Sequence, residues 1–168
     1  MKKLFLVLFV AMAVGSASLQ AQVRAENTNS VNFSLKGLNY NMERAYGESF
    51  TMTYGFSLGG IYNPDDILVV APGIRLEPRI YYNLSRRSQN NRNVKYNSGE
   101  FFSFDLQVIA PMLPDDVSLA ILFTPKWGMR RMLTDNLYLE LTLGIGISII
   151  SLYPVVYTAP GLRLGYIF

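Results

Sequence analysis

Large apolar residues alternate with small or polar residues along most of the chain. In the stretch Phe50–Leu58, every even position is large and apolar, and the odd positions between them are Thr, Gly or Ser. Successive side chains of a β-strand point to opposite faces of a sheet, so this period of two predicts a strand. The same alternation recurs at 68–84, 102–110, 117–131, 137–149 and 156–168.

The start of the alternating region is less regular. Apolar residues occupy odd positions in Val31–Leu35 and even positions in Leu38–Met42, so the phase changes at Lys36-Gly37. Either a β-bulge at Gly37 or a tight turn between two short strands explains this change. We count seven clear strands and expect the eighth around residues 22–36. No convincing helix is predicted, and the polar segment Ser85–Glu100 is expected to be a solvated, flexible loop.

Nearly every predicted strand has one face of bulky apolar side chains. Its other face is rich in small residues (Gly, Ser, Thr) and carries the charged residues. A small barrel has room inside only for side chains that just fill it. The apolar faces must therefore point outward, towards lipid or a large oligomer interface. Strands of this length also match the ~9–11 residues that cross a bilayer on a tilt. The pattern predicts an all-β fold: a closed, antiparallel, up-and-down transmembrane β-barrel. A soluble, lipocalin-like barrel with its apolar faces inside is the alternative.

The alternation assigns charged residues of both signs to the barrel interior. Buried charges are tolerated when they are paired, so we expect one structural ion-pair network that plugs one half of the barrel. Its predicted members are Glu43, Arg75, Glu77, Arg79, Asp105, Lys126, Arg130, Glu140 and Arg163.

Small residues line the opposite half of the predicted interior. That half is expected either to form a shallow cup, which could take a small ligand or a lipid, or simply to narrow. The small residues are Ser57, Gly59, Ala71, Gly73, Ser118, Ala120, Gly144, Gly146, Ser148, Ala159 and Gly161.

Composition excludes several kinds of chemistry. The 168 residues include no Cys and no His, so thiol chemistry, Cys/His zinc sites and His-based triads are unavailable. We find no phosphate-binding loop, metal-ligand spacing or carboxylate pair in a convincing cleft. The chain is therefore expected to be non-enzymatic, with no catalytic residues, cofactor or metal. A formal net charge of +3, with scattered basic residues, does not favour nucleic acid as a partner.

The first 21 residues have the order of a secretory signal peptide. A basic start, Met1–Lys3, precedes the apolar run Leu4–Val14 and the small, polar segment Gly15–Ala21. Eleven apolar residues are too few for a spanning helix, which needs about 20. We expect cleavage after Ala21, with Ala17 as the alternative, which leaves residues 22–168 as the barrel domain.

The chain ends in alternating apolar residues and a terminal aromatic, Leu162, Leu164, Tyr166 and Phe168. This ending resembles the terminal-strand signal by which the insertion machinery recognises outer-membrane barrels of Gram-negative bacteria. With the signal peptide and the alternating strands, the chain resembles the small eight-stranded barrels of the OmpA transmembrane-domain and OmpX type, in an uncharacterised subgroup. The resemblance implies the outer membrane as the location, with its lipid and the insertion machinery as partners. Functions on this fold vary.

The resemblance also has consequences for orientation. If Phe168 ends at the periplasmic rim, Ser85–Glu100 lies on that side too, although such barrels usually have short turns there. An aromatic belt near this rim is expected to comprise Tyr40, Tyr82, Trp127, Tyr166 and Phe168.

We expect a role in envelope structure or surface interaction. Contact with cell-wall polymer or anionic headgroups through Arg86, Arg87, Arg92 and Lys95 is a weaker hypothesis. A lipid-modifying outer-membrane enzyme is disfavoured, because known enzymes of that kind use a His with a Ser and this chain has no His.

Overall fold

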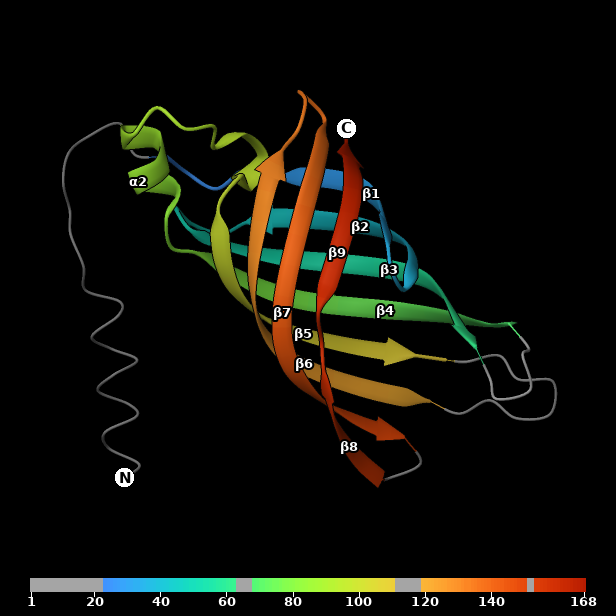
Figure 1. Cartoon of the computed structure of the whole chain (residues 1–168). Coiled ribbons are helices and arrows are strands. Elements are labelled where there is room, and N and C mark those ends of the chain that lie inside the picture. The colour runs from blue at the N-terminus through green and yellow to red at the C-terminus, as the bar shows by residue number, and fades with distance from the viewer. Residues whose placement is uncertain (1–22, 63–67, 111–118, 151–152) are drawn as a thin grey trace, which may run out of the picture.

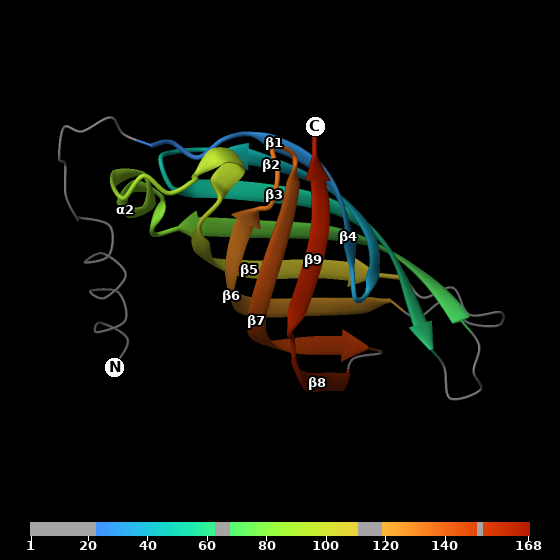
Figure 2. The ribbon, with the colours of Figure 1, turned by 45° about the horizontal axis from the view of Figure 1, so that its top comes forward.

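A computed structural model describes residues 23–62, 68–110, 119–150 and 153–168. The predicted signal peptide lies outside these residues. The described chain is almost entirely β-structure and forms a closed antiparallel barrel (Figures 1 and 2). The strands are β1 (Thr28–Ser34), β2 (Gly37–Ala45), β3 (Phe50–Tyr62), β4 (Leu68–Tyr81), β5 (Glu100–Ile109), β6 (Ala120–Met132), β7 (Leu137–Ile150), β8 (Tyr153–Thr158) and β9 (Gly161–Ile167).

From β1 to β8 each strand pairs with the next in the sequence, and two further pairings, of β9 with β7 and with β1, close the cylinder. β9 pairs with the first half of β7 and with β1, while β8 pairs with the second half of β7. β8 and β9 are therefore two parts of one interrupted strand, and the barrel has eight strands around its circumference. The interruption falls at Ala159-Pro160, where proline has no backbone N–H to give to the ladder.

The phase change near the start is a tight turn. β1 and β2 form a hairpin in which Ser34 is paired with Gly37, so Leu35 and Lys36 make the turn. Gly37 has φ +128°, and a Cβ there would lie 2.8 Å from the Cα of Gly59. Only glycine adopts this backbone conformation readily, which explains its place at the turn. Of the two explanations, the tight turn is the observed one.

The expectation that Ser85–Glu100 contains no helix is wrong. The connection from β4 to β5 contains α2 (Leu84–Gln89) and the single 3-10 turn η1 (Lys95–Asn97). Leu84, Tyr81, Phe101 and Ala25 form a small apolar cluster at this end of the barrel. Figure 1 shows α2 beside the ends of β4 and β5, at the opposite end from the β1–β2 turn. This rim also holds the C-terminal residue and the described N-terminal segment.

Side-chain orientation follows the predicted parity. Large apolar residues on the outer face are exposed, for example Phe33 at 68% and Ile74 at 63%, whereas Glu77 and Glu140 inside are at most 1% exposed. The interior of the barrel is therefore polar and its outer surface apolar, which is the reverse of a soluble, lipocalin-like barrel.

Candidate functional site: the charged barrel interior

The structure brings all nine predicted interior charges together. Their side chains project inward from β2, β4, β5, β6, β7 and β9, and none is more than 8% exposed. The inward direction follows from strand parity, because each of these residues lies on the same face as the small and polar residues of its strand.

Glu140 is the centre of the half nearer α2. It accepts hydrogen bonds from Arg79 (2.8 and 3.2 Å), from Arg130 (2.9 and 3.1 Å) and from Arg163 (2.6 Å). One carboxylate thus faces three guanidinium groups. Charge-assisted hydrogen bonds of this kind are stronger than neutral ones and have preferred geometry, so they hold the strands β4, β6, β7 and β9 in register across the interior.

Glu43 on β2 completes this half of the network. It accepts from Arg130 at 2.7 Å, from the Thr51 hydroxyl at 2.7 Å and from the Tyr81 hydroxyl at 2.9 Å. The Asn97 side-chain amide donates to the same carboxylate at 3.2 Å. Each of these groups is buried, so four hydrogen-bond donors from the protein replace the water molecules that would otherwise solvate the carboxylate.

Glu77 and Asp105 occupy the middle of the barrel. Lys126 lies 3.0 Å from Glu77 and 2.7 Å from Asp105, so it bridges the two carboxylates. Arg75 approaches Asp105 at 3.1 Å, and Arg79 donates to Glu77 at 3.0 Å. The network is continuous from Glu43 near α2 to Arg75 near the other end.

Two aromatic rings fill space beside the arginines. The guanidinium carbon of Arg79 lies 4.5 Å from the ring centroid of Phe101, and that of Arg130 lies 5.0 Å from the centroid of Tyr138. Phe101 and Tyr138 are themselves at most 1% exposed. Cation–π contacts of this kind are stronger when desolvated. This half of the interior is packed.

The segment after β4 covers the packed half. Asn97 accepts from the Glu26 backbone N–H at 2.7 Å and donates to the Glu26 carbonyl at 2.9 Å, besides its bond to Glu43. Arg130 donates to the Tyr96 carbonyl at 3.3 Å. We call residues 82–99, with α2 and η1, the rim cover. Asn97 belongs to no strand and has no periodic signal, so strand parity does not predict its contact with Glu43.

Small residues in the other half make room for long side chains. A Cβ on Gly146 would lie 2.6 Å from the Tyr157 ring, and one on Gly144 would lie 2.7 Å from the Lys126 Cβ. Much of the expected cup is therefore filled by neighbouring side chains. Ser118 lies outside the described residues.

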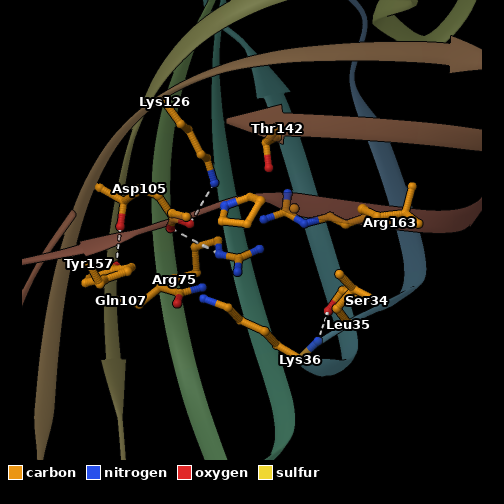
Figure 3. Close-up of a pocket in the computed structure, with 15 residues that line it drawn as sticks. Ser34, Leu35, Lys36, Arg75, Asp105, Gln107, Lys126, Thr142, Tyr157 and Arg163 are labelled. Atoms are coloured by element: carbon orange, nitrogen blue, oxygen red, sulfur yellow. Dashed lines mark hydrogen bonds and ion pairs between the residues drawn. The ribbon is translucent and has the colours of Figure 1, made fainter. Parts of the chain in front are cut away.

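A cavity of about 60 Å³ remains at this end. Figure 3 shows Lys36 reaching from the β1–β2 turn towards Arg75 and Gln107 in this cavity. Lys36 is not among the predicted interior residues, because a turn residue has no strand parity. Arg75, Asp105, Lys126 and Arg163 line the same cavity.

The four basic residues proposed for polymer contact differ in their exposure and in their hydrogen-bond partners. Arg87 is 9% exposed and donates to the Asn93 carbonyl at 3.0 Å. Lys95 donates to the Asp135 carbonyl at 3.2 Å and lies 3.8 Å from its carboxylate. Arg86 and Arg92 are exposed. The four residues do not form one free basic surface.

The C-terminal residues point outward. Leu162, Leu164, Tyr166 and Phe168 are between 42% and 63% exposed, while Arg163 between them points inward. Of the expected belt, Tyr40, Tyr82, Tyr166 and Phe168 are exposed and Trp127 is half-buried. Trp127 donates its indole N–H to the Tyr82 hydroxyl at 2.8 Å.

The described residues hold no group of three or more carboxylates, Cys or His that could bind a metal ion. Within the same residues, no helix is long and apolar enough to cross a membrane. Searches against protein-family models, curated proteins and solved structures find no match for the chain.

Proposed function

We propose that the protein is an integral outer-membrane β-barrel of a Gram-negative bacterium, without enzymatic activity, that contributes to envelope structure or surface contact. The observation that carries this proposal is the inversion of polarity: exposed leucine, isoleucine and phenylalanine side chains surround a closed barrel of paired charges. Soluble monomers rarely expose apolar patches beyond a few hundred Å². Lipid is the environment in which such a surface is stable, and a closed barrel satisfies its backbone there.

A packed interior favours a structural role over transport. Glu140, Arg79 and Phe101 are each at most 1% exposed, and they lie across the lumen near the rim cover. An ion would have to displace several charge-assisted hydrogen bonds to pass. We therefore expect no steady conductance from the protein in planar bilayers, in contrast to larger barrels with a water-filled channel.

Residues at the two ends of the chain support export and insertion. Residues 1–21 have the signal-peptide pattern, and Leu162, Leu164, Tyr166 and Phe168 form an exposed terminal strand that the insertion machinery could recognise. With the C-terminus at the periplasmic rim, the rim cover lies in the periplasm. Arg86 and Arg92 on the cover are then the residues available for contact with cell-wall polymer.

Fractionation tests the proposal directly. The protein should be recovered with outer membranes, and it should migrate faster on gels without boiling than after boiling, because a folded barrel resists detergent. Recovery in the soluble periplasm, or stable solubility after refolding without detergent, would contradict it. In the variant Leu133→Cys, the thiol lies beside the rim cover and should not react with membrane-impermeant thiol reagents on intact cells. Labelling of this thiol would mean that the rim cover faces the outside of the cell.

A further inference from the structure

The cavity at the end of the barrel opposite the rim cover has an unusual composition of charges. Its wall includes four cationic side chains, from the β1–β2 turn, β4, β6 and β9, and one carboxylate, Asp105 on β5. The four cations are Lys36, Arg75, Lys126 and Arg163. Uncharged hydrogen-bonding side chains complete the polar lining, from Ser34, Gln107, Thr124, Thr142 and Tyr157.

The charges of the whole described interior do not balance once Lys36 is included. The ion-pair network contains five cations and four carboxylates, and Lys36 is a sixth cation, so the described interior carries a formal excess of two positive charges. Near α2 each carboxylate is surrounded by its donors, whereas Lys36 and Arg75 lie at the cavity end. The excess of positive charge is therefore located at the cavity.

Lys36 has no carboxylate within ion-pair distance among the described residues. Its ammonium lies 5.6 Å from the centroid of the Tyr157 ring. Although the residue as a whole is exposed, partial desolvation of the ammonium and the nearby Arg75 guanidinium lower the pKa of Lys36. A negatively charged group in the cavity would favour the charged ammonium and raise this pKa again.

Arginine N–H groups at the cavity are also available as hydrogen-bond donors to a bound group. All the ion pairs of Arg163 with described residues use one terminal nitrogen, to Glu140 at 2.6 Å and to Glu77 at 3.9 Å. A guanidinium has five N–H donors arranged in a fork. The Gln107 amide oxygen, in its hydrogen-bonding orientation, faces Arg75 and holds that guanidinium at the cavity wall. Figure 3 shows these groups converging on the same space.

We propose that this cavity binds a phosphate group. A phosphate near pH 7 carries between one and two negative charges, which matches the excess of two cations, and its oxygens accept several charge-assisted hydrogen bonds. A cavity of about 60 Å³ is large enough for a few waters or one such group. Lys36 and the free N–H groups of Arg163 and Arg75 hold the oxygens, with Thr142 at the edge. The ligand is either inorganic phosphate or the phosphate of a small ester or lipid headgroup.

Calorimetric titration of the refolded protein with inorganic phosphate tests the inference, in a detergent whose headgroup carries no phosphate and at constant chloride. We expect saturable binding of one phosphate per chain. Lys36→Gln should weaken this binding about tenfold or more, because it removes one charge-assisted hydrogen bond from an exposed turn residue. Arg24→Gln, at an exposed position on the opposite rim, makes the same change of charge and should leave the affinity unchanged.

Further titrations separate the sources of the phosphate. Glycerol phosphate should compete with inorganic phosphate if the cavity takes a free group. Competition by phosphatidic acid in nanodiscs, without competition by glycerol phosphate, would assign the site to a lipid headgroup and still support phosphate binding. Absence of saturable binding would mean that the cavity holds no phosphate. Equal weakening by Lys36→Gln and Arg24→Gln would mean a non-specific charge effect. Either result would overturn the inference, whether or not the barrel is found in the outer membrane.

Discussion

Arg130 and Glu43 meet across the barrel at 2.7 Å, although 87 positions separate them in the chain. Each lies near the end of its strand at the rim that carries the cover, and Asn97 of the cover donates to the same Glu43 carboxylate. The pair therefore connects β2, β6 and the rim cover. Removing one partner of a buried pair leaves the other charge uncompensated, which costs more than the pair itself contributes.

Arg130→Gln should consequently lower the free energy of unfolding by about 3–5 kcal/mol. Urea denaturation in lipid vesicles, followed by the fluorescence of Trp127, measures the effect. The matched control is Lys95→Gln, which breaks an exposed pair with Asp135 and should cost less than about 1 kcal/mol. Equal losses in the two variants would mean that the interior pair is as weak as a surface pair.

Strand parity predicts the barrel and the inward direction of all nine charged side chains. It does so because one face of each strand carries bulky apolar side chains and the other carries small or polar ones. A single shift of register would have moved Glu77 and Glu140 to the outer surface, so the alternation specifies the pairing strongly. The hairpin at Leu35-Lys36 is one of two explanations for the change of phase in the alternation, because a bulge produces the same change as a turn.

Other features have no periodic signal in the sequence. α2 has only six residues, too few for a helical repeat to be recognised, and Asn83 beside it makes no capping bond because its side chain accepts from the Glu100 N–H at 2.8 Å. Asn97 reaches Glu43 from a backbone with φ +62°, a conformation that asparagine tolerates better than most residues. Lys36 enters the cavity from a turn. These positions depend on tertiary contacts that alternation does not encode.

Interior glycines face aromatic rings, and a methyl group there should be destabilising. A Cβ on Gly165 would overlap the ring of Tyr138, which is 1% exposed and cannot move outward. Gly165→Ala should lower the free energy of unfolding by about 1–3 kcal/mol through overpacking. Gly47→Ala is the control, because a Cβ on Gly47 would meet nothing within 4 Å. If both variants unfold at the same urea concentration, the ring packing inside the barrel differs from that described.

Loss of the Asn97 amide should loosen the rim cover without opening the barrel. Asn97→Ala removes three hydrogen bonds, two to the Glu26 backbone and one to Glu43. We expect faster proteolytic cleavage within residues 84–99, while the faster migration of the unboiled barrel on gels is retained. Asn90→Ala, at an exposed position after α2, should leave the cleavage rate unchanged. Unaltered cleavage in Asn97→Ala would show that the apolar cluster around Leu84 holds the cover without it.

A charge on the outer face separates a membrane barrel from a soluble one. Ile74 is 63% exposed at the middle of β4, and its neighbours across the strand pairs are Phe56 and Val108. In a bilayer, Ile74→Arg should cost about 2–4 kcal/mol, because the guanidinium would lie near the midplane. Leu133→Arg is the matched control: Leu133 is 54% exposed in the β6–β7 turn, where the same change should cost at most about 1 kcal/mol. Urea unfolding of both variants in lipid vesicles measures the difference. In a soluble barrel both arginines would face water and neither would reduce stability, so equal, negligible losses would contradict the proposed membrane location.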